Sequence, residues 1–149
     1  MTATGHAILG TVIAAKVGNP YLAVPLAMLS HIAADAFPHW DTATNYRRKS
    51  RFRLFSDSFL DVIISLILPL LIVKFLFPTT DIIYTYAIVF VAQLFDWATA
   101  PYYFFNINLP PFTWAYNFQK IFDNRLDKPW GIINQVTILI IITLLATIY

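Results

Sequence analysis

The chain has 149 residues, of which 58% are hydrophobic and 12% are charged, and its formal net charge is +2. Average soluble domains carry about 25% charged residues, so the composition argues against a disordered chain, a coiled coil and an ordinary soluble domain. The small net charge argues against nucleic-acid binding, and a sequence without cysteine excludes disulfides, thiolate metal sites and cysteine nucleophiles. We therefore expect a single all-α integral membrane domain over residues 1–149.

The first half of the sequence predicts three apolar helices. Residues 2–15 form a short helix rich in small residues, which let membrane helices approach closely. A turn at residues 18–20 leads to a second helix over about residues 21–36, so the first two helices form a short hairpin. The polar stretch 40–54 then precedes a third helix over about residues 56–77.

The second half predicts two more apolar helices. A fourth helix covers about residues 82–105. Residues 106–129 mix prolines, aromatic residues and charges, which indicates an amphipathic segment at the membrane interface, with a plain polar loop as the alternative. Residues 130–149 carry no charge and are long enough to cross a bilayer, which needs about 20 residues. The expected fold therefore has about five apolar helices and one interfacial segment.

The lysines and arginines predict the orientation. If every apolar segment crosses, one side receives loops 40–54 and 106–129 and holds eight of the ten basic residues. We expect that side to be cytoplasmic and the C-terminus to be external, in a multi-pass protein of the inner or plasma membrane with lipids as its partners.

Seven ionisable side chains lie within or beside the apolar segments. At the bilayer centre such groups cost about 2.5–3.5 kcal/mol, so they are retained when they pair, bind ions or do chemistry. With the expected topology, helices of opposite direction bring them to a similar depth, and His6, His31 and Asp61 should share one pocket. The seven are His6, His31, Asp35, His39, Asp57, Asp61 and Asp96.

Two pairs among these residues are spaced i, i+4, and each pair therefore faces one side of its helix. His31 pairs with Asp35, and Asp57 pairs with Asp61. Two carboxylates one turn apart repel each other unless a cation lies between them or one is protonated. Imidazole together with carboxylate favours zinc, manganese or iron over magnesium, as one ion or as two. The predicted metal ligands are His6, His31, Asp35, His39, Asp57 and Asp61, and the predicted catalytic carboxylates are Asp61 and Asp96.

Structural interpretations stand beside these predictions. His6 also fits an interfacial histidine, and His31 with Asp35 fits a neutral hydrogen-bonded pair. His39 and the nearby Asp41 fit an interface anchor followed by a cap, and Asp57 fits a helix cap. For the whole protein, the alternatives are an ion- or proton-handling transporter and a non-catalytic structural membrane protein.

The N-terminal motifs resemble a known family. Small predicted inner-membrane metal-dependent hydrolases of bacteria and archaea have a similar histidine in a glycine-spaced helix, followed by a Pro, Asp and His cluster at a membrane boundary. The resemblance covers about residues 4–41 and implies hydrolase activity, with His6, His31, Asp35 and His39 as ligands. The order differs around Pro38, because the family often has a Pro-Asp-x-Asp-His run. The matching motifs are Thr4-Gly5-His6 with Gly10, and Ser30-His31-x-x-x-Asp35-x-x-Pro38-His39-x-Asp41.

The sequence thus favours a membrane-embedded metal-dependent hydrolase with its site at the cytoplasmic interface. A basic run from Arg47 to Arg53 follows the second helix, and such a run suits phosphate or anionic lipid headgroups. A phosphoester, including one in a lipid headgroup, is therefore the favoured substrate class. The alternative is that the basic run serves membrane orientation alone.

Overall fold

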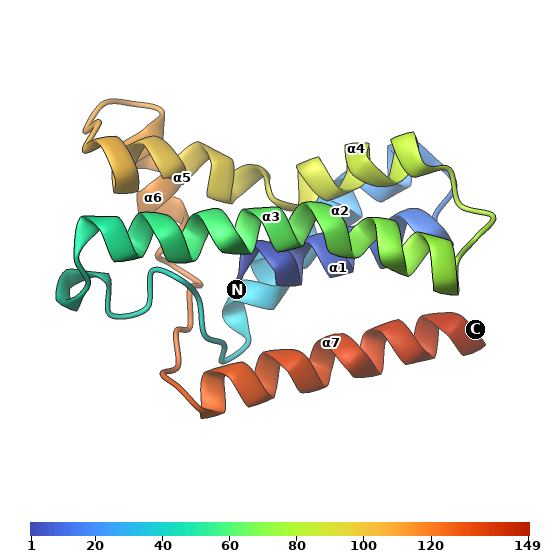
Figure 1. Ribbon diagram of the computed structural model, residues 1–149. Coiled ribbons are helices and arrows are strands. Elements are labelled where there is room, and N and C mark those ends of the chain that lie inside the picture. Colours follow the sequence, from blue (N-terminus) through green and yellow to red (C-terminus); the bar gives the residue numbers. More distant parts are fainter.

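The computed structural model describes the backbone of residues 1–149 and every side chain except that of Arg47. Its described backbone is all-helical, as the composition predicts, and has seven α-helices and one 3-10 helix (Figure 1). The elements are α1 (Ala3–Lys16), α2 (Pro20–Ala36), η1 (Tyr46–Arg48), α3 (Arg51–Leu76), α4 (Ile82–Ala92), α5 (Leu94–Phe105), α6 (Phe112–Gln119) and α7 (Trp130–Ile148).

Side-chain caps set the start of the first three α-helices. The hydroxyl of Thr2 accepts the amide of Gly5 at 3.1 Å, and the Asn19 side chain accepts the amide of Tyr21 at 2.9 Å. Ser50 caps α3, which therefore begins at Arg51, earlier than the predicted start at residue 56. Such caps satisfy amide groups that have no partner within the helix.

The predicted fourth helix is broken. Helices α4 and α5 meet at Gln93 with a bend of 52°. At the break, the ring of His31 donates to the carbonyl of Ala92 at 2.7 Å, and the Gln93 amide donates to the carbonyl of Ala3 at 2.8 Å. Side chains that engage the backbone of a helix in this way are a known cause of kinks. The bend places the first turn of α5 beside α1 and α2.

Fewer helices are long enough to span a membrane than the five that we predicted. Among the described residues, α3 and α7 are long and apolar enough to cross a membrane. The bent pair of α4 and α5 adds a third candidate if the two helices form one span. Helix α1 has 14 residues and α2 has 17, below the roughly 20 that a full crossing needs. The prediction of a membrane protein is compatible with these helices, but the number of spans was too high.

Small residues let α1, α2 and α4 pack closely. Ala14, Ala27 and Ala92 are buried together in one apolar cluster. A Cβ atom added to Gly10 would lie 3.0 Å from the Cβ of Ala92 and 3.0 Å from the Cα of Val89, so α4 passes too near for a larger residue. The predicted role of small residues in the first helix is therefore confirmed.

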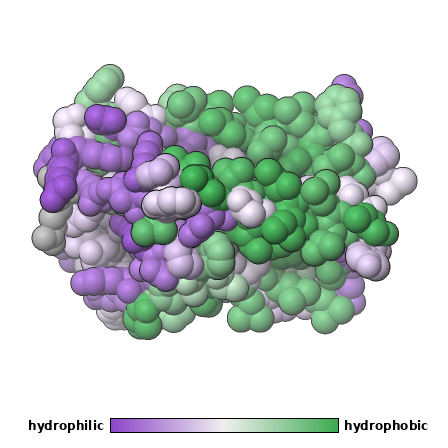
Figure 2. All heavy atoms as spheres, turned by 90° about the horizontal axis from the view of Figure 1, so that it is seen from below, coloured by the Kyte–Doolittle hydropathy of each residue, from purple (hydrophilic) through white to green (hydrophobic). Residues whose placement is uncertain are grey.

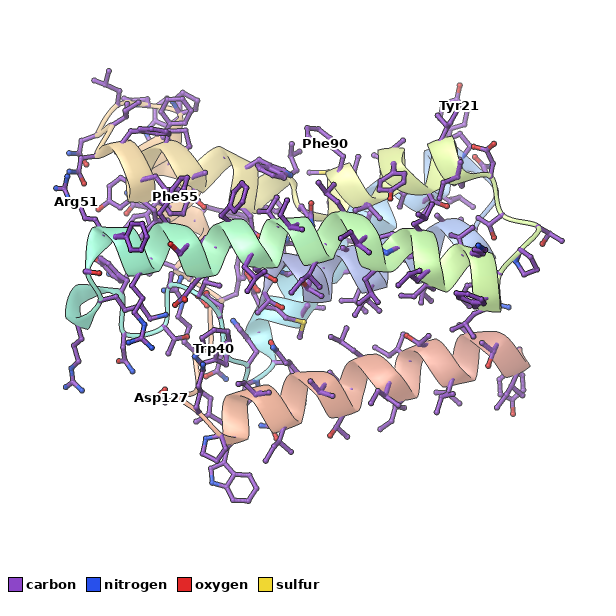
Figure 3. The ribbon with its side chains drawn as sticks, viewed as in Figure 1. Tyr21, Trp40, Arg51, Phe55, Phe90 and Asp127 are labelled. Atoms are coloured by element: carbon purple, nitrogen blue, oxygen red, sulfur yellow. The ribbon has the colours of Figure 1, made fainter. Side chains whose placement is uncertain are left out.

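The molecule has a polar half and an apolar half. Figure 2 shows hydrophilic residues gathered at the end where α3 begins and hydrophobic residues over the rest of the face. Many large apolar side chains of α3 and α7 are exposed, which suits contact with lipid. In Figure 3, Tyr21 and Phe90 project outward from the apolar half, whereas Arg51 and Asp127 lie in the polar half.

The segment of residues 106–129 folds against the polar half. It contains α6, which packs on α5, and then runs back to the end of α2. There the amide of Asn124 donates to the carbonyl of Asp35 at 2.8 Å, and the amide of Leu126 donates to the carbonyl of His39 at 2.6 Å. Its position at a membrane interface stays a prediction. Its contacts with α2 bring further polar side chains beside the predicted ligands.

Candidate metal centre

Three side chains from α1 and α2 converge at the boundary of the two halves. The rings of His6 and His31 are stacked, with centroids 3.7 Å apart and planes 11° apart. Asp35 lies between them and His39, with Oδ1 3.2 Å from His6 Nε2 and Oδ2 3.3 Å from His31 Nε2. All of these side chains are buried. The sequence spacing of His31 and Asp35 thus places both groups on one side of α2, facing α1.

Backbone carbonyls fix which nitrogen of two imidazoles carries the proton. His31 Nδ1 lies 2.7 Å from the carbonyl of Ala92, and His39 Nδ1 lies 2.7 Å from the carbonyl of Phe37. Because a carbonyl only accepts, each Nδ1 is the donor, and each Nε2 is the nitrogen that faces the carboxylates. Nε2 of His31 also lies 3.4 Å from the side-chain amide of Gln119. Metal-binding histidines in proteins are oriented by the same contact.

Asp96, on the first turn of α5, completes the group around His6 and His31. Its two oxygens lie 3.8 Å from His6 Nε2 and 3.8 Å from His31 Nε2. Oδ2 has no hydrogen-bond donor among the side chains that the structure describes, whereas Oδ1 accepts from the amide of Gln119 at 3.0 Å. One ring nitrogen from each of His6 and His31 and one oxygen of Asp96 lie close enough together to bind a single ion.

Donors and a positive charge already face Asp35. The α-amino group of Met1 forms an ion pair with Oδ1, and the amide of Gln119 donates to Oδ2 at 3.2 Å. Burial of a carboxylate is costly without such compensation. The Met1 α-amino group and the Gln119 amide therefore compensate the burial of Asp35 in this structure.

His39 belongs to a second group on the other side of Asp35. Its Nε2 lies 3.9 Å from Asp35 Oδ1 and 3.5 Å from Asp123 Oδ1. His39, Asp123 and Asp41 also present ligand atoms close enough together for one ion. Our sequence analysis missed Asp123, because it lies in a mixed charged stretch with no spacing that relates it to α2. The only signal was a carboxylate in a segment bearing prolines and aromatic residues.

Arg125 links the second group to a tyrosine. Its guanidinium lies 2.7 Å from Asp123 Oδ2 and 3.1 Å from Asp41 Oδ2, and it donates to the Tyr103 hydroxyl at 3.1 Å. Burial raises the pKa of Asp123, but contacts with His39 and Arg125 outweigh it and lower the pKa. Burial lowers the pKa of Arg125, but the carboxylate of Asp41 first, then Tyr103 and Asp123, raise it overall. Both groups are therefore charged at neutral pH.

Asp57 and Asp61 do not join the ligands that we predicted with them. Asp57 forms an ion pair with Lys49 at 3.1 Å at the polar end of the molecule. Asp61 accepts three hydrogen bonds from the start of α1: from the amide of Ala3 at 2.7 Å, and from the amide and hydroxyl of Thr4 at 3.1 and 2.6 Å. The expectation that an ion lies between these two carboxylates is not met, because each has its own donors. Of the three residues expected in one pocket, only His6 and His31 face each other.

A cavity of about 120 Å³ opens beside the candidate centre. Its wall has the carboxylates of Asp41, Asp61 and Asp96 together with other polar groups, including Gln119 and Arg125, and apolar side chains of α3 and α5 such as Leu54 and Phe104. The basic side chain of this lining is that of Arg125. The predicted anion-binding run lies elsewhere among the described side chains: Lys49 pairs with Asp57, Arg48, Arg51 and Arg53 are exposed, and the side chain of Arg47 is outside the described residues.

The residues present fit a divalent metal by donor chemistry. Buried imidazole nitrogens and buried carboxylate oxygens are the ligand set of zinc, manganese or iron. Among the described side chains, the imidazole and carboxylate atoms without a hydrogen-bond partner at the centre are His6 Nδ1 and Nε2, His39 Nε2, Asp96 Oδ2 and Asp123 Oδ1. Comparisons of this chain with protein-family models, with curated proteins and with solved structures found no match.

Proposed function

We propose that the chain is a membrane-embedded metal-dependent hydrolase that acts on a phosphoester at the cytoplasmic boundary of the bilayer. One observation carries the proposal: the buried imidazoles of His31 and His39 have their Nδ1 atoms on backbone carbonyls and turn their Nε2 atoms towards buried carboxylates. In both rings the Nδ1 proton is held by a backbone carbonyl, so Nε2 is the nitrogen that faces the carboxylates.

Each residue at the proposed centre would have a separate role. His6, His31 and Asp35 would hold the ion, which would activate water and polarise the phosphoryl group as a Lewis acid. Asp96 borders both imidazoles and is 29% exposed towards the cavity, so it is placed to accept the proton of an attacking water. Asp61, our other predicted catalytic carboxylate, holds the start of α1 instead.

The cavity supports an amphiphilic phosphoester as substrate. The Tyr103 hydroxyl, which accepts from Arg125, can donate to a phosphate oxygen, and Arg125 adds a positive charge that it shares with Asp41 and Asp123. The apolar side chains of α3 and α5 in the same lining suit a hydrocarbon chain. Exposed aromatic residues such as Phe55 and Phe59 lie on the same stretch of α3. The substrate would therefore enter from the bilayer, with its phosphate towards the polar half.

The proposed orientation places the polar half on the cytoplasmic side. That half contains the loop with η1 and the segment around α6, which carry most of the basic residues. Cytoplasmic loops are enriched in lysine and arginine. The C-terminal end of α7 is then external.

The test combines metal analysis with phosphate release. The full chain, purified in detergent, is analysed for bound zinc, manganese and iron, and phosphate release is measured with phosphatidic acid in mixed micelles. We expect stoichiometric metal and metal-dependent release, both abolished in Asp35→Asn and both retained in Asp57→Asn, a carboxylate that lies outside the centre.

The outcomes separate the competing functions. Tight metal without hydrolysis of any phosphoester contradicts the enzyme and favours a structural ion. Ion flux in sealed vesicles that depends on His31 favours a transporter. A chain that folds without metal and binds none when zinc or manganese is supplied is a structural membrane protein.

A further inference from the structure

The group of His39, Asp123 and Arg125 does not take part in the proposed centre as described, although it touches it through Asp35. His39 is fully buried, and its Nε2 has no hydrogen-bond partner among the described residues. This nitrogen points between two carboxylate oxygens, 3.5 Å from Asp123 Oδ1 and 3.9 Å from Asp35 Oδ1. Asp123 Oδ1 is likewise buried and unpartnered within that described set.

The contacts of His39 turn its Nε2 towards two carboxylate oxygens. Its Nδ1 donates to the carbonyl of Phe37 at 2.7 Å, so the neutral ring presents a lone pair at Nε2. A lone pair that faces two carboxylate oxygens in a buried place is repelled by both. Either a second proton on the ring or a cation between the three atoms removes the repulsion.

The distances suit a cation. Tetrahedral ligands at about 2.0–2.2 Å from a metal lie about 3.4 Å from one another. The separation of 3.5 Å between His39 Nε2 and Asp123 Oδ1 matches that spacing and exceeds the usual length of a charge-assisted hydrogen bond, about 2.7–2.9 Å. The 3.2 and 3.3 Å separations of Asp35 from His6 and His31 match it as well.

Arg125 pairs with one carboxylate oxygen of Asp123 and leaves the other oxygen facing His39. It lies 2.7 Å from Asp123 Oδ2, whereas Oδ1 is turned to His39. It also contacts Asp41, whose other oxygen accepts the amides of Ala43 and Thr44. Arg125 and Asp41 therefore position Asp123, and the unused oxygen of Asp123 completes the group.

We propose that the chain binds a second divalent metal ion between His39 and Asp123, and that Asp35 bridges the two ions. Asp35 is the carboxylate that the two groups share: its Oδ2 faces His31, and its Oδ1 faces His6, His39 and the Met1 α-amino group, which a second ion would displace. Two ions about 3.5–4 Å apart clamp the attacking and leaving oxygens of a phosphoryl group. The inference rests on the proposed function, because it places the second ion beside the first.

The experiment counts ions in the full chain. Protein in detergent is exposed separately to excess manganese(II) and zinc(II), passed through a desalting column, and analysed for metal per chain. We expect two ions in the wild type, one in Asp123→Asn and two in Asp127→Asn, a matched control on an exposed carboxylate of the same loop. With manganese, paramagnetic resonance should show an exchange-coupled pair that is lost in Asp123→Asn.

A second variant is a control for the possibility that Asp123→Asn loses an ion through misfolding. His39→Gln removes the imidazole from the other side of the site and should also reduce two ions to one, with size-exclusion profile and helical circular dichroism unchanged. A wild type with one ion, unaffected by Asp123→Asn, overturns the second site and leaves the proposed function standing. Two ions that persist in both variants overturn it as well. No ion with either metal overturns both proposals.

Discussion

Two pairs of residues that share the spacing i, i+4 on their helices have different surroundings in the structure. His31 and Asp35 on α2 lie among the imidazoles of His6 and His39 and the carboxylate of Asp96, with the Met1 α-amino group and the Gln119 amide also on Asp35. Asp57 and Asp61 on α3 lie apart from those imidazoles, the first beside a lysine and the second at the start of α1. The spacing i, i+4 fixes only which side of a helix two groups share. Whether they need a cation depends on the donors that other elements bring to them, and those lie far away in sequence.

The sharpest way to break this comparison is to remove the shared carboxylate. Asp35→Ala should abolish tight metal binding, because Asp35 touches His6, His31 and His39 at once. Loss of such a ligand should weaken affinity by more than about 100-fold, beyond the 10–100-fold typical of outer groups. Competition with a chromogenic chelator measures it. Asp57→Ala is the control, and equal loss in that variant would contradict the contrast between the helices.

Gln119 tests the groups that orient the carboxylates. Its amide donates to Asp96 and to Asp35, so Gln119→Leu should weaken metal affinity by about 10–100-fold without removing a ligand. The same chelator titration gives the constant. An affinity equal to that of the wild type would show that these carboxylates are held by their helices alone.

Asp61 should matter for folding and leave metal binding intact. Asp61→Ala leaves the amides of Ala3 and Thr4 without an acceptor at a partly buried helix start, which should cost about 1–3 kcal/mol. Thermal unfolding in detergent, followed by circular dichroism, measures the change. If Asp61→Ala loses its metal while retaining its fold, Asp61 is a ligand as first predicted.

Asp57 should have the smallest effect. Its pairing with Lys49 is partly exposed, so Asp57→Ala should change the free energy of unfolding by less than about 1 kcal/mol. The same unfolding measurement applies, at low and at high salt. A larger loss that persists at high salt would show that this ion pair is part of the core at the polar end.

Helical class, the small-residue packing of the first helix and the ends set by prolines were readable from the sequence, because they depend on neighbours along the chain. Phe37 ends α2 before Pro38, as that proline requires. The break at Gln93 was not readable, because its causes include His31 and Ala3, which reach it across the bundle. Apolar composition alone overstated the number of spans, because an apolar helix can be too short to cross a bilayer and pack against its neighbours instead.

Part of the candidate centre was readable for the same reason. His6, His31, Asp35 and His39 lie on two consecutive short helices and the turn that follows, so direction and depth predicted their meeting. Asp96 was chosen for its depth, and the structure places it beside the same imidazoles. Asp123, Gln119 and Arg125 come from a segment whose path back to α2 is set by main-chain bonds at Asn124 and Leu126, which no side-chain pattern records.

Those main-chain bonds have a consequence for biosynthesis. The residues after α6 are tied to the end of α2, so the donor set is completed by a late part of the chain. When α1 to α5 have emerged from the ribosome, the three histidines are already outside it, whereas Gln119, Asp123 and Arg125 have not yet emerged. Because domains fold as their segments emerge, the set of imidazoles, carboxylates and donors stays incomplete in the nascent chain until residues 120–129 pack against the end of α2. The metal binding that we propose would therefore be a late event in the maturation of this protein, following the assembly of its first helices.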